Sequence, residues 1–305
     1  MIDDQIKIEH PKVLLLGKTG QVGSDLLPLL AGFSELHAPD RRDLDLSHPK
    51  CIRDLVRTLQ PDVIVNAAAY TAVDKAEGEP EAAATLNTHV PALLAEEAAR
   101  SRALLIHYST DYVFDGAKPQ PYVESDPVNP QNVYGKTKAA GEDAITASGC
   151  RHLIFRTSWV FSPRGSNFLL TILRLARERE ELLIVNDQIG APTSSESIAR
   201  SSVQVLKQWL GQNLEARGIK TGTYHLTSSG HVSWFDFARE IIRQYGSDSL
   251  RVRKITPIYS RDYPTPARRP QNSRLDCSKI EVAYQIVMPH WQTSLSAVLE
   301  PLLRC

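Results

Sequence analysis

The feature of this chain that most restricts its fold is the alternation, in its first half, of short apolar runs with longer stretches of helical spacing. The apolar runs predict strands at 13–16, 34–38, 63–65, 104–106 and 152–157, and the segments between them predict helices at 20–30, 48–59, 81–100 and 133–147, the third interrupted near Pro91. Strands of this length separated by helices require right-handed crossovers. The sequence therefore predicts an α/β fold with a doubly wound parallel sheet.

The alternation loosens after Thr157. Helical spacing returns at 168–178, 197–210, 234–245 and 291–303, with irregular, Pro-rich stretches between, notably at 259–272. Leu182–Val185 is an apolar run that predicts one more core strand of the sheet. We therefore expect residues 1–158, with part of 180–215, to form the sheet domain, and residues 159–305 to form mainly a smaller, loop-rich domain.

Composition excludes several classes of function. The 35 basic and 35 acidic residues give a formal net charge of zero, so nothing predicts electrostatic capture of nucleic acid or of an anionic membrane. The four cysteines are far apart and form no Cys-x-x-Cys pair, which predicts neither a disulfide framework nor a structural zinc site. The first residues do not resemble a signal peptide, and no apolar run approaches the ~18 residues of a spanning helix. We expect a cytoplasmic protein.

A glycine-rich turn follows the first predicted strand and opens the first predicted helix. Its pattern is G-x-x-G-x-x-G, and it is not a P-loop because no Gly-Lys-Ser/Thr closes it. Glycines at such a turn let the backbone approach a pyrophosphate, which then lies on the helix N-terminus. The turn predicts a Rossmann-type dinucleotide site, with contacts from Gly17, Thr19, Gly20, Gln21, Val22 and Gly23.

Further coenzyme contacts are expected where later strands end. About twenty residues after the glycines, a carboxylate reads a ribose 2′-hydroxyl or an arginine accepts a 2′-phosphate. Asp40, Arg41 and Arg42 offer both groups, and the arginines can equally form a solvated loop. Asp45 and Leu46 are expected near the adenine. The third strand runs into the small side chains of Ala68 and Ala69, which let a coenzyme lie flat or simply allow tight packing. Tyr70, the next residue, is also an expected coenzyme contact.

A tyrosine and a lysine four residues apart are the strongest catalytic signal. Tyr134 and Lys138 share one helix face, and an ammonium beside a phenol lowers its pKa. Tyr134 is then a proton donor to a carbonyl under reduction. Alone, such a pair also fits a solvated helix face. The catalytic interpretation is favoured by the glycine turn and by Thr110 and Asp111 at the end of the fourth predicted strand.

Taken together, these residues resemble the extended short-chain dehydrogenase/reductase superfamily and, more specifically, the dTDP-4-dehydrorhamnose reductase family. The resemblance covers nearly the whole chain. It rests on the segments Gly17–Gly23, Val65–Lys75, Ser109–Gly116, Asn132–Lys138, Phe155–Trp159, Asn186–Thr193 and Arg269–Arg274. It implies reduction of the 4-keto group of a dTDP-6-deoxysugar, dTDP-4-dehydro-β-L-rhamnose, to dTDP-β-L-rhamnose by NADPH or NADH. This is the last step of dTDP-rhamnose biosynthesis.

The resemblance also implies roles for single residues. Tyr134 is the proton donor, Lys138 lowers its pKa and holds the nicotinamide ribose, and Thr110 orients the substrate carbonyl beside Asp111. Trp159 matches a position that contacts the sugar.

A metal site and an arginine cluster are two further expectations. Some family members bind a divalent metal at a dimer interface. Asp25 and Glu196 stand near those positions, so Mg²⁺ and either a monomer or a homodimer stay open. Asp25 also suits the first turn of a helix as an acid favoured by the macrodipole. The dTDP diphosphate needs cations, and the candidates are Arg268, Arg269 and Arg274, which can equally form a solvated basic loop.

Two other functions compete with the reductase. One is a non-catalytic regulatory subunit on the same fold, like the β subunit of methionine adenosyltransferase. The other is a nucleotide-sugar epimerase or 4,6-dehydratase, but dehydratases need an acid pair at the strand end. Here Tyr112 follows Asp111, which disfavours that reading.

Overall fold

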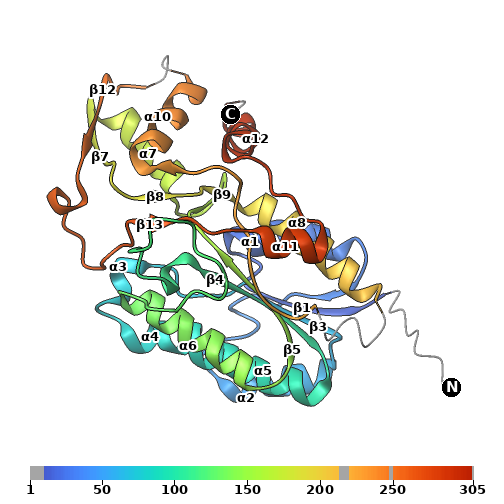
Figure 1. The fold of residues 1–305 in the computed structure, drawn as a ribbon. Helices are drawn as coiled ribbons and strands as arrows, with labels where there is room; N and C mark the ends of the chain where they lie inside the picture. Colours follow the sequence, from blue (N-terminus) through green and yellow to red (C-terminus); the bar gives the residue numbers. More distant parts are fainter. Residues whose placement is uncertain (1–9, 213–219, 247–249, 304–305) are drawn as a thin grey trace.

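The computed structural model describes residues 10–212, 220–246 and 250–303, and its central element is a six-stranded parallel sheet (Figure 1). The strands lie in the order β10-β5-β4-β3-β1-β2. Their bounds are β1 Lys12–Leu16, β2 Glu35–His37, β3 Val63–Asn66, β4 Leu104–Thr110, β5 Arg151–Thr157 and β10 Gly222–His225. The predicted doubly wound parallel sheet is confirmed.

Helices cover both faces of this sheet because its strands are apolar on both sides. In β1, Val13 and Leu15 pack into one core while Leu14 and Leu16 pack into the other, as expected when successive side chains point to opposite faces. The first core is covered by α1 Gln21–Ala31, α8 Ser195–Leu210 and α11 Ser278–Tyr284, and the second by α2 Pro49–Leu59, α5 Val90–Ser101 and α6 Val133–Ala147. Residues after 194 therefore rejoin the sheet layer.

The predicted helix at 81–100 is broken, as expected, before Pro91. It consists of α4 Pro80–Ala84, a π-helical turn η1 Thr85–His89, and α5. Pro91 has no N–H to donate to the carbonyl of Asn87. That carbonyl packs against α6, where a Cβ added to Gly141 would lie 2.1 Å from it. The π-turn thus follows from a missing donor and a close helix contact.

The prediction that Leu182–Val185 joins the main sheet is wrong. β7 Glu181–Val185 pairs in parallel with β12 Lys254–Ile258 in a separate two-stranded sheet. Buried and exposed residues alternate along β7, so one face meets solvent, unlike the fully buried strands β3 and β4. The sixth strand of the main sheet is instead β10, whose four residues pair with β5.

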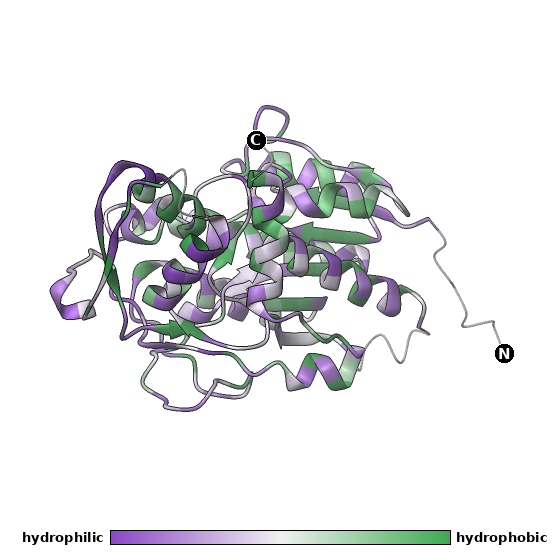
Figure 2. Ribbon diagram, turned by 90° about the horizontal axis from the view of Figure 1, so that it is seen from above, coloured by the Kyte–Doolittle hydropathy of each residue, from purple (hydrophilic) through white to green (hydrophobic). Residues whose placement is uncertain are grey.

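A second part of the molecule packs around β7 and β12. It contains α7 Phe168–Glu178, α10 Trp234–Tyr245 and α12 Trp291–Leu303, and these three predicted helices are confirmed, with a core of their own rich in aromatic side chains. Figure 2 shows this apolar interior and the polar outer surface.

Short pairings join the second part to the loops above the sheet. They are β6 Val160–Phe161 with β9 Thr193–Ser194, and β8 Ile189–Gly190 with β11 Val232–Ser233 and β13 Asn272–Ser273. Within the described ranges, no helix has the length and apolar character needed to cross a bilayer.

Candidate active site

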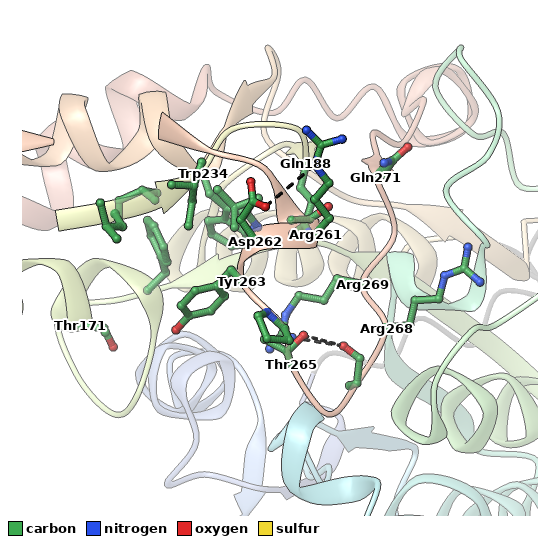
Figure 3. A pocket seen from close by; sticks show the side chains of 18 of the residues that line it. Thr171, Gln188, Trp234, Arg261, Asp262, Tyr263, Thr265, Arg268, Arg269 and Gln271 are labelled. Carbon is green, nitrogen blue, oxygen red and sulfur yellow. Dashed lines mark hydrogen bonds and ion pairs between the residues drawn. The ribbon is translucent and has the colours of Figure 1, made fainter. Parts of the chain in front are cut away.

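Two cavities lie at the carboxyl ends of the sheet strands. The first, of about 800 Å³, is lined by the glycine turn, by the loop after β2, by the end of β3 and by the start of α6. It lies where the strand order reverses between β1 and β3, the usual ligand site of a doubly wound sheet. The second, of about 1340 Å³, is enclosed by α7, β7 and the loop at 258–271 (Figure 3). The rings of Tyr112 and Tyr134, one from each lining, meet edge to face at 5.8 Å.

The glycine turn has the shape that a coenzyme pyrophosphate requires. Gly17 has φ +85°, and a Cβ there would lie 2.6 Å from the backbone nitrogen of Ala68. A Cβ on Gly23 would lie 2.0 Å from the carbonyl oxygen of Gly17, so only glycine lets the helix pack on the turn. Gly20 caps α1 without a side-chain hydrogen bond, which leaves N–H groups at the helix start for an anion.

Most of the predicted coenzyme contacts line the first cavity. They are Gly17, Thr19, Gly20, Gln21, Val22, Asp40, Arg41, Asp45, Leu46, Ala68, Ala69, Tyr134 and Lys138. Two others do not line it. Gly23 acts through the packing just described, and the hydroxyl of Tyr70 donates a hydrogen bond to Glu79 at 2.7 Å.

Two basic residues of this cavity were missed by the sequence reasoning. Lys18, inside the glycine turn, lies 3.7 Å from the carboxylate of Asp40, and Arg164 reaches from the loop after β6 to Asp25 and Ser24 on α1. Lys18 could have been suspected from its place between the glycines. Arg164 could not, because 140 residues separate it from Ser24.

Asp40 is held by its own loop. Its carboxylate accepts the backbone N–H of Arg42 at 2.8 Å and that of Asp43 at 3.3 Å. These bonds, with Lys18, hold the pKa of Asp40 below its usual range. Arg41 lines the cavity, whereas Arg42 does not. A carboxylate and two cations, Lys18 and Arg41, thus surround the expected position of the adenosine ribose.

Tyr134 stands at the start of α6, which Asn132 caps by accepting the N–H of Gly135 at 2.8 Å. Burial raises the pKa of Tyr134 to about 12, and a hydrogen bond with Thr110 opposes that rise. Tyr134 therefore carries its proton at neutral pH, as a proton donor must.

The structure does not show the expected lowering of the pKa of Tyr134 by Lys138, because burial, Thr110 and Asp111 account for the shift of Tyr134. The ammonium turns toward β4 instead, where Nζ donates to the carbonyl of Tyr108 at 2.5 Å and lies 3.1 Å from Nε2 of His107. Burial lowers the pKa of Lys138 itself to about 8. Helix spacing places both residues near one face, but the strand beneath the helix decides where the long lysine side chain ends.

Of the expected substrate contacts, Arg269 lines the second cavity, whereas Thr110, Asp111 and Trp159 do not. Asp111 is buried, accepts a hydrogen bond from Thr110 at 3.1 Å, and has a pKa raised by burial to about 7. Trp159 has φ +50° and stacks on Trp234 with ring centroids 3.3 Å apart. Trp234 lines the cavity, whereas Trp159 does not.

The predicted arginine cluster is divided. Arg269 lines the second cavity and forms a two-pronged ion pair with Asp74 of α3 Val73–Ala76, at 2.6 and 3.1 Å. Arg268 also lines it, is exposed, and points to the other side of the loop (Figure 3). Arg274 bonds instead to Asn272 and to the carbonyl of Pro119, away from the lining.

The structure does not support a metal at Asp25 and Glu196. The carboxylate of Asp25 accepts a hydrogen bond from Ser195 at 2.5 Å and pairs with Arg164 at 3.2 Å, while Glu196 pairs with Arg200 at 2.7 Å. Among the residues that the structure describes, no group of three or more potential metal ligands gathers.

Comparison with known proteins agrees with the geometry. The chain matches the RmlD substrate binding domain family over residues 11–304. It is 44% identical to the dTDP-4-dehydrorhamnose reductase of Escherichia coli K12, over 95% of this chain and 97% of that one. It is 43% identical to the reductase of the same name from Burkholderia thailandensis, over 96% and 99%.

Solved structures show the same fold. A dTDP-4-dehydrorhamnose reductase from Clostridium acetobutylicum superposes with a TM-score of 0.88 at 36% identity, covering 95% of this chain and 99% of that one. One from Bacillus anthracis, in complex with NADP, gives 0.85 at 30% identity with the same coverage. The chain therefore belongs to the dTDP-4-dehydrorhamnose reductase family.

Proposed function

We propose that this chain uses NADPH or NADH to reduce the 4-keto group of dTDP-4-dehydro-β-L-rhamnose, which yields dTDP-β-L-rhamnose. The observation that carries the proposal is the meeting of two cavities at Tyr134, one shaped for a dinucleotide and one large enough for a sugar nucleotide. The relatives are named for this reaction.

The coenzyme supplies the hydride, and the protein supplies position and protons. As negative charge grows on the substrate oxygen, Tyr134 gives it a proton. Thr110, whose side chain opposes the rise in the pKa of Tyr134, stabilises the same oxygen when this matters most. A well-placed general acid contributes about 10²–10⁴-fold in rate. Burial helps because it keeps the tyrosine protonated until the substrate oxygen becomes basic enough to take the proton.

We propose that both coenzymes are used, with a preference for NADPH. Asp40 can accept a ribose hydroxyl, and Lys18 and Arg41 can bind a 2′-phosphate. A phosphate would draw Lys18 away from Asp40. Opposed charges at one site fit dual use better than strict selection of either coenzyme.

For the substrate, we propose that the diphosphate binds the arginine loop. Arg269 is already oriented by Asp74, to which Nη1 and Nη2 donate, and its remaining N–H groups on Nε and Nη2 can meet phosphate oxygens. Arg268, whose side chain is exposed and lines the same cavity, is the second cation. Trp234, backed by Trp159, provides an aromatic wall near the sugar.

The decisive experiment incubates the purified chain with dTDP-4-dehydro-β-L-rhamnose and NADPH. We expect NADPH to be consumed in proportion to a product identified by NMR as dTDP-β-L-rhamnose. Coenzyme binding without turnover would instead favour the regulatory-subunit alternative, which the comparisons do not support. A cytoplasmic location belongs to the proposal, because the three described cysteines are free thiols.

A further inference from the structure

A buried chain of hydrogen bonds leads away from Lys138, and the mechanism above does not use it. Nζ of Lys138 lies 3.1 Å from Nε2 of His107, and Nδ1 of His107 lies 3.2 Å from Nδ2 of Asn66. All three residues are at most 1% exposed. His107 and Asn66 lie on neighbouring strands, β4 and β3, and are paired in register. The arrangement therefore lies within the paired strands of the central sheet.

The last hydrogen bond of this series, at Ala68, determines which way the amide of Asn66 faces. The backbone N–H of Ala68 donates to Oδ1 of Asn66 at 3.2 Å. An N–H cannot donate to an NH₂ group, so the oxygen must face Ala68 and the NH₂ must face His107. Turning the amide over would leave the partly buried Ala68 N–H without this acceptor, which costs free energy.

The amide in turn determines the tautomer of His107. Because the NH₂ of Asn66 donates to Nδ1, that nitrogen holds a lone pair. Burial and Lys138 push the pKa of His107 well below its usual range, so the ring is neutral and its single proton is on Nε2. The group that His107 presents to Lys138 is thus an N–H donor.

A lysine ammonium has three donors and no acceptor, whereas the neutral amine has a lone pair. An N–H pointing at Nζ therefore bonds well to the amine and poorly to the ammonium. We propose that His107, oriented by Asn66, is a positioning residue that holds Lys138 against β4 and favours its neutral form, so that Lys138 more readily gives up a proton to replace the one that Tyr134 has given to the substrate oxygen. The proposal rests on the proposed function only in assigning Lys138 to that site.

No other neighbouring charge accounts for this bias. Charged groups on the elements packed against α6 are mostly paired with one another: Glu142 on α6 with Arg156 of β5, Asp74 with Arg269, Lys75 with Glu79, and Glu97 with Arg57 and Arg100. Of the remaining titratable groups on these elements, Glu81 and His89 are exposed, and Arg151 and His152 lie at the far end of β5. Asp111 accepts from Thr110, and Glu142 favours the ammonium. Burial lowers the pKa of Lys138, and the N–H of His107 is the neighbouring group that we infer acts in the same direction.

The first test reads the tautomer directly in the coenzyme-free protein. Nitrogen-15 NMR of histidine-labelled wild-type chain should show His107 as a neutral ring protonated on Nε2 from pH 6 to 9. The signal is assigned by its loss in His107→Gln. If that variant does not fold, His225→Gln removes the other deeply buried ring and identifies His107 as the remaining signal that does not titrate. A proton on Nδ1, or a charged ring at pH 6, would overturn the proposal whether or not the reductase activity exists.

The second test uses the alkaline limb of the rate against pH. In His107→Gln the amide can turn its oxygen toward Nζ and accept from the ammonium, so the limb should move up by about one pH unit. His152→Gln, a histidine replaced on neighbouring β5, is the control and should not move it. In Asn66→Asp the new carboxylate accepts hydrogen bonds from both the Ala68 N–H and His107, so the ring proton moves to Nδ1. Nε2 can then accept from the Lys138 ammonium, and the alkaline limb should again move to higher pH.

A negative charge at position 66 could raise the limb without the ring. The double variant His107→Leu/Asn66→Asp separates the effect of the added charge from the effect of the ring tautomer. Leucine has no ring proton, so in this background only the charge of the new carboxylate can act on Lys138. We expect the shift caused by Asn66→Asp to be at least halved in the His107→Leu background. An equal shift in both backgrounds, or an unmoved limb in His107→Gln, would show that His107 only fills space.

Discussion

The two halves of the binding region are built differently, and the difference explains how each can be altered. The coenzyme cavity is centred on the glycine turn between β1 and α1, where backbone atoms pack closely. The substrate cavity is lined by α7, by β7 and by the loop at 258–271, which is tied to the sheet part by contacts such as Asp74 with Arg269 and Asn132 with the carbonyl of Arg268. Substitutions should therefore act through backbone packing in the first and through single charges in the second.

The largest expected effect lies where the two halves meet. Tyr134→Phe removes the proton donor but keeps the ring that packs on Tyr112. We expect kcat to fall by about 10²-fold or more, with NADPH binding nearly unchanged when measured by titration. Turnover within a few-fold of wild type would show that another group donates the proton.

The substrate half should respond to the loss of one charge. Arg269→Ala should weaken dTDP binding about ten- to a hundred-fold, because a charge-assisted contact contributes about 1.5–3 kcal/mol. NADPH binding should be unaffected. Asp74→Asn is the matched variant, since it keeps Arg269 and removes only its orienting partner, and its loss should be smaller. Equal losses for dTDP and NADPH would indicate misfolding, and no loss for dTDP would remove Arg269 from the site.

The coenzyme half should respond to one added methyl group. Gly23→Ala places a Cβ 2.0 Å from the Gly17 carbonyl, and such overpacking costs about 1–3 kcal/mol. We expect both a lower free energy of unfolding by denaturant and a higher KM for NADPH. Gly32→Ala, where the nearest atom would be 3.6 Å away, is the control. Equal behaviour of the two variants would show that the turn is more adaptable than its geometry indicates.

Coenzyme choice should respond more weakly, because the charges near Asp40 are partly exposed. We expect the ratio of kcat/KM for NADPH to that for NADH to fall about five-fold in Lys18→Ala and by a similar factor in Arg41→Ala/Arg42→Ala. This corresponds to roughly 1 kcal/mol of lost preference for NADPH. We expect Lys18→Ala to have at least as large an effect as the arginine pair, since Arg42 does not line the cavity. An unchanged ratio in both would place the 2′-phosphate elsewhere.

The smallest expected effect is that of metal removal. Because Ser195 and Arg164 already satisfy Asp25, a chelator should leave the rate unchanged. A loss of rate that Mg²⁺ restores would show that this carboxylate exchanges its partners for a cation.

Local patterns predicted the helices of both halves but only the strands of the first. Helices such as 133–147 and 168–178 are confirmed at the predicted residues, because their apolar spacing is complete within the segment. Short strands carry little information of their own. β10 has four residues and joins the sheet only through pairing with β5, whereas Leu182–Val185 has the same composition as a core strand and pairs elsewhere.

What the sequence by itself determined are the features whose causes lie within a few residues: the β1–turn–α1 unit with its glycines, the alternation of the first half, and the Tyr134–Lys138 spacing. Only the tertiary structure decided the direction of the Lys138 side chain, the pairing of Asp74 with Arg269, and the reach of Arg164 to α1. The physical reason is that a buried polar group takes whichever partner the packed neighbours bring within about 3 Å. Those partners lie 30 to 195 residues away in the chain.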